Sequence, residues 1–384
     1  EADKAIALNP VEQTQASGRV PKDTKRYADF NGSTYEGWTP LGDAFGQAPA
    51  GRGQWVRNAD SVARLRGGYA HSGVISGKLR GTLQSPDFTI SHDRVWLRVA
   101  GRGTVRIVIN GYMMQRYRDL LFEGTEIKVD VPVDQFAWVE LSQSLKNYKG
   151  HRAYLEIEDD SDGVLVVDEV LFANAPPPKE KAPVSLPTTP QEAAALAPYA
   201  QRMAQAERDL PAPVQVLAMR EGTPADEHVR TRGVVSSLGG LVPRGLPQAI
   251  SGKDRKPILP EQGSGRLMLS QWMVDRDNPL TARVRVNWVW QHLMGAGIVA
   301  TADDFGAMGK PASHPLLLDH LAQKFRGQMR WSMKTLIREI VLSRTYRMSS
   351  DTTDPQAERA DPDNTLLHRS RVRRLEGEAI RDAL

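Results

Sequence analysis

Residues 278–297, NPLTARVRVNWVWQHLMGAG, decide the fold class of the second half of this chain. Asn278 is a good helix N-cap, and Pro279 at the first helical position loses nothing by lacking an N–H group. The apolar residues that follow recur at intervals of three and four, the spacing that lines one face of a helix: Val286, Val289, Trp290 and Leu293. Glycines at positions 295 and 297 then end the helix.

Two further helices with the same kinds of signals follow. One is predicted to begin at residues 313–315, where a serine precedes a histidine and a proline, and to end at Gly327. The other is predicted to begin at Ser332, with an apolar stripe at Met333, Leu336, Ile337, Ile340 and Val341. Because start, face and stop signals agree in all three, the sequence predicts a helical core between residues 275 and 350.

From residue 27 to residue 174 the pattern is that of short strands. Apolar and polar residues alternate over 95–99 and 105–109, and Asn110-Gly111 favours a tight hairpin turn. Further strands are predicted at 127–131, 138–141, 153–158 and 164–172. Many short strands with glycine-rich joins predict an antiparallel β-sandwich of the jelly-roll type. The predicted fold class is therefore α+β multidomain: a β-sandwich followed by an all-α domain with long irregular loops.

A proline-rich, charged segment, NAPPPKEKAPVSLPTTP, separates the two regions and favours extended backbone. Thr189 and Glu192 then form a capping-box pattern that predicts a helix over about 191–208. Residues 222–265 lack periodicity and predict a long ordered loop. The expected domains are 1–26, an N-terminal extension or the end of a missing upstream domain; 27–175, a carbohydrate-binding-like β-sandwich; 176–190, a linker; and 191–384, a helical domain truncated at its C-terminus.

The composition excludes several function classes. The chain has 384 residues, no cysteine and a formal net charge of +4. Without cysteine, these residues contain no disulfide, zinc–thiolate site, thiol nucleophile or covalent c-type haem attachment. No apolar run approaches the roughly 18 residues that span a bilayer, so no membrane span is expected. The charge excess is too mild to predict a nucleic-acid partner.

The helical half resembles a known family. The stretches DRDNPLTARVRVNWVWQHLMGAGIVATADDFGAMGKPASHPLLLDHLA, WSMKTLIREIVLSRTYRMSS and DPDNTLLHRSRVRRLEGEAIRDAL, with REGTPADEHVRTRGVVSSLGGLVPRG upstream, resemble a planctomycete-specific domain of unknown function found beside c-type cytochrome domains. The resemblance covers residues 217–384, although relatives typically have arginine where this chain has Trp288. It implies an exported protein whose c-type haem is carried by missing upstream domains or by a partner.

The strand-rich half has its own resemblance. The stretches DFNGSTYEGWTPLGDAFGQAPA, GYAHSG, GKLRGTLQSPDFTI and VVDEVLF resemble galactose-binding-like jelly-roll modules that accompany glycoside hydrolases. This implies recognition of a polysaccharide or other glycan rather than its cleavage. Sugar rings present apolar C–H faces and hydroxyl rims, so a site needs aromatic rings beside side chains that donate and accept. The candidate glycan-binding residues are Trp38, Asp43, Phe45, Arg66, His71, Tyr112 and Arg116; the alternative is that these aromatic residues pack in the core.

Two further sets of polar residues are candidates for chemistry. Calcium prefers carboxylate oxygens, and Asp29, Glu36 and Asp168 are candidate ligands for a structural calcium ion in the sandwich. No other cofactor is expected within this chain. In the helical domain the candidate catalytic residues are Arg283, Asn287, Asp304, His314 and Glu376. Structural roles in capping, hydrogen bonding and helix stitching are the alternative, since no serine elbow, P-loop or dinucleotide fingerprint is present.

Three functions are compatible with these patterns. The preferred one is an extracytoplasmic glycan-binding and interaction protein, periplasmic or extracellular, associated with cytochrome-bearing domains or subunits. The second is part of a haem-linked oxidoreductase or carbohydrate-active enzyme whose active centre is completed by missing domains. The third is a structural subunit of a large extracytoplasmic assembly. An aromatic groove on the sandwich would favour the first, whereas a polar pocket uniting the helical-domain candidates would favour the second.

Overall fold

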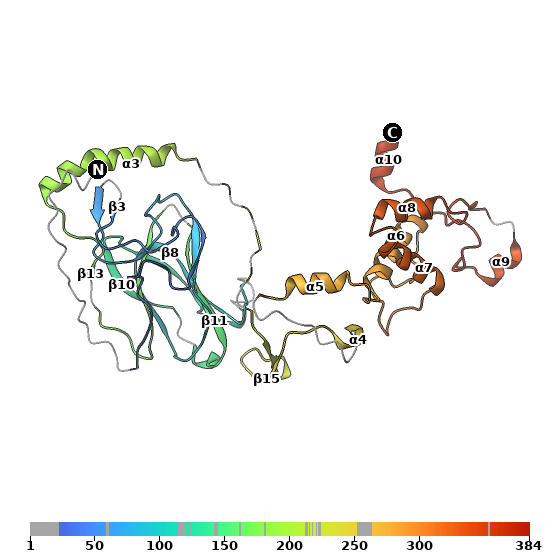
Figure 1. Ribbon diagram of the computed structural model, residues 1–384, viewed down its shortest axis with the longest axis horizontal. Coiled ribbons are helices and arrows are strands. Elements are labelled where there is room, and N and C mark those ends of the chain that lie inside the picture. The colour runs from blue at the N-terminus through green and yellow to red at the C-terminus, as the bar shows by residue number, and fades with distance from the viewer. Residues whose placement is uncertain are drawn as a thin grey trace. The chain divides into compact units, whose positions relative to one another are not determined.

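The chain forms two compact units, Glu1–Val242 and Pro243–Leu384. The first, the sandwich unit, contains most of the strands, and the second, the helical unit, contains six of the described α-helices together with the short helix α4 (Gln248–Ser251) (Figure 1). The computed structural model describes residues 23–58, 61–113, 120–122, 124–141, 145–160, 163–179, 182–211, 214, 216, 218–219, 221, 224–251, 263–351 and 354–384.

The sandwich unit is built around β8 (Val95–Ile109), the 15-residue central strand of one large antiparallel sheet. The first half of β8 pairs with β12 (Leu165–Phe172) and β10 (Gln135–Glu140). Its second half pairs with β11 (Arg152–Asp159) and β9 (Glu126–Val131). The outer strands are β1 (Lys25–Ala28), β2 (Thr39–Gly42), β5 (Ala70–His71), β6 (Gly81–Gln84), β7 (Phe88–Thr89) and β13 (Ala182–Pro183), and β3 (Trp55–Asn58) and β4 (Ser61–Arg64) form a separate hairpin. This half-barrel, jelly-roll-like sheet followed by helices confirms the predicted fold class.

Strand β8 changes its pairing strands at Gly101. The structure differs here from the predicted strands. The sequence predicted two strands, over 95–99 and 105–109, but the structure has one continuous strand. Gly101 adopts a φ of 89°, a conformation open to glycine, and a Cβ at this position would lie 1.8 Å from the Val164 carbonyl oxygen. Asn110 and Gly111 both take positive φ, as their dipeptide predicted, but the tight-hairpin prediction is wrong because β9 begins only at Glu126.

The core of the sandwich unit follows the two-residue period of its strands. Alternate residues of β8, β11 and β12 share one apolar cluster, in which Leu97, Leu155 and Val167 are fully buried. A smaller cluster uses residues of the opposite register, such as Val166, together with Phe136 and Tyr69. Because each fully buried side chain of this kind contributes about 1.5–3 kcal/mol, the register of the sheet is strongly fixed.

Helix α3 (Pro190–Asp209) belongs to the sandwich unit, whereas the sequence had placed it in the helical domain. Its predicted capping box is confirmed, since Thr189 and Glu192 exchange both side-chain to backbone hydrogen bonds. The apolar face of α3 brings Leu196 and Ala200 against Val62 of β4. The helix therefore covers one side of the sandwich unit, at the top of the view in Figure 1.

The long loop predicted over 222–265 is partly a hairpin. Strand β14 (Glu227–Arg230) pairs with β15 (Leu238–Val242). Several of its apolar side chains, including Val229 and Leu241, are more than half exposed. The hairpin escaped prediction because it has little buried surface and therefore little apolar alternation.

The helical unit contains the three predicted helices as α6 (Thr281–Met294), α7 (Pro315–Arg326) and α8 (Met333–Val341). The buried faces of α6 and α7 meet in one core through Val286, Trp290, Leu321 and Phe325. The helix predicted from Asn278 starts three residues later, although the Asn278 side chain still accepts a hydrogen bond from Leu280 N at 2.9 Å. Its other α-helices are α5 (Arg266–Met273), α9 (Pro355–Ala360) and α10 (Gly377–Ala383).

Candidate functional site

A pocket of about 200 Å³ lies beside β1, where the chain leaves the sheet. We call it the aromatic pocket and define it by its lining residues: Tyr27, Ala28, Asp29, Phe30, Thr34, Tyr35, Glu36, Trp38, Pro86 and Asp87. Three residues singled out from the sequence, Asp29, Glu36 and Trp38, therefore line one pocket. The sequence had assigned them to two different sites.

The loop that carries most of the pocket has an uncommon backbone. Phe30 and Glu36 adopt φ values of 49° and 47°, a left-handed conformation that side chains other than glycine rarely take, and Gly37 follows at 89°. Such residues cost free energy, and they persist only where the surrounding packing enforces them. Here the enforced turns place the Glu36 side chain at the pocket while the Phe30 ring is buried at 6% exposure.

Tyr27 is held rigidly at one side of the pocket. Its ring stacks on Phe172 with centroids 4.7 Å apart and meets Phe88 edge-on at 5.1 Å. The hydroxyl donates to the Pro86 carbonyl oxygen at 2.8 Å. Burial raises the pKa of Tyr27 to about 12, so the phenol stays neutral at physiological pH. This ring is therefore a fixed, uncharged surface.

The other aromatic rings form the floor. Trp38 packs edge-on against Phe30 at 5.3 Å, and both are only 6% exposed. Tyr35 donates its hydroxyl hydrogen bond to Phe45 O at 2.7 Å, and burial raises its pKa above the usual value for a phenol. A wide, flat platform on Trp38 is thus excluded in this structure, and what remains is a small recess between packed rings.

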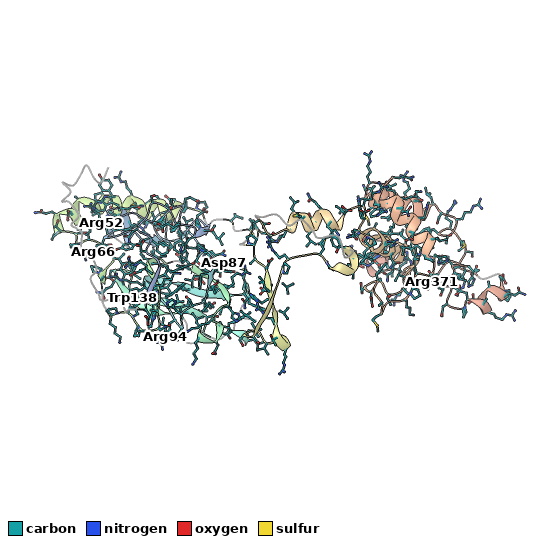
Figure 2. The ribbon with its side chains drawn as sticks, turned by 60° about the horizontal axis from the view of Figure 1, so that its bottom comes forward. Arg52, Arg66, Asp87, Arg94, Trp138 and Arg371 are labelled. Atoms are coloured by element: carbon teal, nitrogen blue, oxygen red, sulfur yellow. The ribbon has the colours of Figure 1, made fainter. Side chains whose placement is uncertain are left out.

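Carboxylates surround this recess. Glu36 is exposed, Asp29 is partly exposed and accepts a hydrogen bond from Asn31 N at 3.2 Å, and Asp87 pairs with Arg152 at 3.0 Å. Asp87 is labelled on the sandwich unit in Figure 2. Because an ionised carboxylate only accepts hydrogen bonds, the rim suits a ligand rich in hydroxyl or amino hydrogens. Sequence reasoning missed Tyr27 and Asp87, since nothing in a single sequence shows that β1 and residues 86–87 lie together.

The remaining candidate glycan-binding residues that the structure describes lie outside the aromatic pocket. Phe45 is 2% exposed in the main core, and Tyr112 packs on Phe122 with centroids 5.4 Å apart. Asp43 lines another cavity of the same unit, and His71 lies in a larger groove described below. Figure 2 shows Arg66 in a different part of the sandwich unit from Asp87. Arg116 lies outside the described residues. The predicted set is therefore dispersed over several surfaces.

The three candidate calcium ligands do not form a metal site. Among the described residues, no group of three or more His, Asp or Glu side chains is placed to hold a metal ion. Asp168 instead pairs with Arg98 at 2.9 Å. Burial outweighs the attraction of that guanidinium and raises the pKa of Asp168 to about 6. Its carboxylate is committed to an ion pair within the sandwich unit.

Asn287 of the helical unit has a structural role. Its side chain is fully buried, donates to Val299 O at 3.0 Å and accepts from Val299 N at 2.9 Å. Both hydrogen-bonding groups of one backbone residue are satisfied by one amide, which ties α6 to the chain that follows it. Because the side chain is 0% exposed, it is out of reach of a substrate in this structure.

The other helical-unit candidates also make local bonds. Arg283 pairs with Asp319 at 2.6 Å, which joins α6 to α7. Asp304 accepts from Gly306 N at 2.7 Å within its own turn, and His314 contacts the neighbouring Ser313 hydroxyl at 3.0 Å through Nδ1. Glu376 precedes α10 as its exposed N-cap. Arg283 thus joins two helices, whereas neither His314 nor Glu376 makes a side-chain hydrogen bond that caps its helix.

Comparisons with known proteins match different parts of the chain. A family model described as PSD1, protein of unknown function (DUF1553), matches residues 265–384. Among solved structures, one similar chain is TmCBM61 in complex with beta-1,4-galactotriose, at 12% identity and a TM-score of 0.22, covering 38% of this chain and 98% of that one. Another is a family two carbohydrate esterase from Cellvibrio japonicus, at 11% identity and a TM-score of 0.17, covering 40% of this chain and 37% of that one. No curated protein matches the chain.

The family match lies within the helical unit and assigns it no function. Within the described part of the chain, no helix combines the length and apolarity needed to cross a membrane.

Proposed function

We propose that this chain is a glycan-binding protein and that the aromatic pocket of its sandwich unit holds a single neutral sugar ring. The observation that carries the proposal is the convergence of aromatic rings and carboxylates on one small recess, at a loop with left-handed Phe30 and Glu36. A backbone held in this conformation is a feature that clusters at ligand-binding loops.

The chemistry of a sugar ring fits both parts of the pocket. Its C–H groups are apolar and pack on the edges and faces of aromatic rings, while its hydroxyl groups donate hydrogen bonds to carboxylates. In this arrangement Tyr27 and Trp38 contact the ring, and Asp29 and Glu36 accept from its hydroxyls. The pocket volume of about 200 Å³ lies below the roughly 300–1,000 Å³ of sites for larger ligands, so one ring is the unit recognised.

The wider biological setting rests on the sequence resemblance alone. A location outside the cytoplasm and an association with c-type cytochrome domains or subunits are what the family resemblance implies. An enzymatic role for the helical unit has less support, because Arg283 and Asn287 are engaged in bonds that hold α6 in place. We therefore place ligand recognition in the sandwich unit.

Calorimetric and NMR titrations of the full chain with neutral mono- and oligosaccharides test this function. A single hexose has about twelve non-hydrogen atoms, and at ~0.3 kcal/mol per atom its dissociation constant is on the order of millimolar. Asp29→Asn and Glu36→Gln preserve side-chain shape but remove charge, and each is expected to weaken binding about tenfold.

Asp43→Asn is the matched control, because Asp43 is an exposed carboxylate of the same unit that does not line the aromatic pocket. It is expected to bind sugar as the unmodified chain does. Absence of saturable binding across the sugar panel would refute the proposal. Equal weakening by Asp43→Asn would also refute it, because the effect would then reflect the net charge of the protein.

A further inference from the structure

The sandwich unit contains a second, larger cavity of about 750 Å³. We call it the basic groove and define it by its lining residues: Val56, Arg57, His71, Gly77, Lys78, Gly101, Arg102, Asp130, Val131, Pro132, Val133, Gly163, Val164, Val184, Ser185 and Glu207. It shares no lining residue with the aromatic pocket. Its volume falls within the range of about 300–1,000 Å³ that is typical of ligand sites.

Helix α3 supplies a wall of this groove through Glu207. The Glu207 carboxylate accepts from Ser76 Oγ at 2.6 Å and from Gly77 N at 2.7 Å, and it pairs with Arg57. Burial pushes the pKa of Glu207 upward, but these donors outweigh burial and keep it below its usual value. The carboxylate is thus ionised, and most of its acceptor capacity is used to fasten α3 to the strands.

His71 lines the groove as a neutral hydrogen-bond donor. It is 3% exposed, and burial lowers its pKa to about 4. Gly73 N donates to Nδ1 at 3.0 Å, so the ring proton is on Nε2. At physiological pH this buried side chain is therefore uncharged, with an N–H group on the ring atom that Gly73 does not occupy.

The charged side chains of the groove differ in how strongly they are paired with other residues. Three cations, Arg57, Lys78 and Arg102, face two carboxylates, Asp130 and Glu207, which leaves one positive charge in excess (3 − 2 = 1). Lys78 Nζ makes one long hydrogen bond, 3.3 Å to Arg208 O at the end of α3. Arg102 pairs with Asp130 at 2.8 Å, but both side chains are more than 70% exposed. Exposed pairs of this kind are worth little and are readily exchanged for another partner.

This combination points to a saccharide that carries a negative charge. A sugar hydroxyl both donates and accepts, and the adjacent Arg102 guanidinium and Asp130 carboxylate offer it one partner of each kind. Lys78 and His71 add donors that a neutral sugar satisfies incompletely but that a carboxylate or sulfate group satisfies fully. The lining also includes five valines, whose side chains offer apolar surface to the C–H groups of a sugar ring. Among the described lining residues, the imidazole is the sole aromatic ring, so charge takes the place of stacking.

We propose that the basic groove is a second binding site and that it takes an anionic oligosaccharide, with Lys78, Arg102 and His71 as the residues that recognise the acidic group. The site is independent of the aromatic pocket, and this inference does not require that the pocket bind sugar. It does require α3 to be docked, because Glu207 forms part of the lining.

Calorimetry on the full chain tests this site with four probes: trigalacturonate, its methyl-esterified form, a sulfated trisaccharide and hexaglutamate. The methyl ester keeps every ring and linkage but has no charge. We expect saturable binding of trigalacturonate or of the sulfated trisaccharide that weakens with added salt, and at least tenfold weaker binding of the ester and of hexaglutamate. Which of the two anionic sugars binds more tightly distinguishes carboxylate from sulfate as the preferred group.

Variants locate the site. Lys78→Ala and Arg102→Ala are each expected to weaken binding of the preferred anionic sugar about tenfold, as removal of one charge-assisted contact does. Lys149→Ala is the control with the same change in net charge, since Lys149 pairs with Asp93 and lies outside the groove. Asp29→Asn, which alters the aromatic pocket, is expected to leave this binding unchanged.

Each remaining outcome overturns the proposal. No binding of either anionic sugar would leave the groove without the assigned ligand. Equal losses of affinity for the anionic sugar in Lys78→Ala and Lys149→Ala would indicate non-specific attraction to the basic protein. Tighter binding of hexaglutamate than of both sugars would assign the groove to an acidic peptide instead. Because neutral-sugar binding is measured separately with Asp29→Asn, failure here leaves the test of the aromatic pocket intact.

Discussion

The sandwich unit and the helical unit use the same kinds of polar side chain in opposite ways. In the helical unit, Asn287 and Arg283 make bonds that hold α6 in place. In the sandwich unit, apolar strands supply nearly all of the packing, and polar residues such as Lys78 and Glu36 lie on loops that line cavities. A sheet with a large core can leave polar groups available for ligands, whereas a small helical core uses them for its own stability.

This contrast separates folding residues from binding residues, and substitutions can test whether the two sets are distinct. If it is correct, changes at the backbone of β8 and at Asn287 reduce the free energy of unfolding strongly. Changes at the loop carboxylates and at Lys78 should alter ligand affinity with little effect on stability. Because the chain has two compact units, stability is best followed unit by unit with hydrogen exchange rather than as one transition.

The largest effect is expected for Gly101→Ala. A Cβ at this position would lie 1.8 Å from Val164 O, and the residue must also keep a φ of 89°. We expect a loss of more than about 4 kcal/mol in the sandwich unit, measured by denaturant unfolding and hydrogen exchange of β8 and β12. Gly111→Ala is the control: its φ is 76° but no atom of the described residues lies within 4 Å of the added Cβ, so a loss of only about 1–2 kcal/mol is expected. Similar losses of unfolding free energy in both variants would show that the contact with Val164 is unimportant.

Asn287→Ala is expected to be the most damaging change in the helical unit. It leaves the N–H and C=O of Val299 without their partners in a buried site, at a cost of about 1–3 kcal/mol for each group. We expect a total loss of about 3–4 kcal/mol, seen as faster hydrogen exchange in α6 and α7. Trp288→Ala, at the neighbouring and 40% exposed position, removes a hydrogen bond to Ala302 O but leaves α6 and Val299 bonded, and it should cost only about 1–2 kcal/mol. If α6 kept its protection in Asn287→Ala, the assignment of Asn287 to folding would be wrong.

His71 is expected to make the sandwich unit sensitive to acid. Its pKa is about 4 in the folded chain and about 6.5 when unfolded, so the unfolded state binds a proton more readily. The stabilising contribution is therefore complete above pH 6.5 and is lost as the pH falls toward 4, on the order of 3 kcal/mol in total. In His71→Asn, whose side-chain oxygen can accept from Gly73 N, the free energy of unfolding should depend less on pH between 6.5 and 4. An unchanged pH dependence would contradict the assignment.

Sequence patterns predicted the elements of this fold better than its site. Helices α6, α7 and α8 follow from their apolar spacing, and the sheet follows from alternation, because burial of a face repeats with the period of the element. The aromatic pocket could not be assembled in the same way. It depends on β1 lying beside residues 86–87, and that contact joins segments about 60 residues apart with no periodic signal. Phe45 was predicted as a binding residue although it lies in the core, whereas Trp38 is almost as buried but lines the aromatic pocket.

The basic groove was not predicted from the sequence for a related reason. The smallest expected change in stability concerns Glu207, the residue of α3 that lines this groove. Glu207 reaches Ser76 and Gly77 across about 130 residues of sequence, so nothing local marks it as part of a site. Glu207→Ala should remove these bonds and cost about 2 kcal/mol, confined to α3. Hydrogen exchange should then increase in α3 while the exchange of β8 and β11 is retained, and affinity for the anionic sugar should fall. Glu192→Ala, which removes one half of the capping box at the other end of α3, is the control that weakens the helix without touching the groove. Loss of sugar affinity only in Glu207→Ala would show that the end of α3, rather than its helicity, completes the groove.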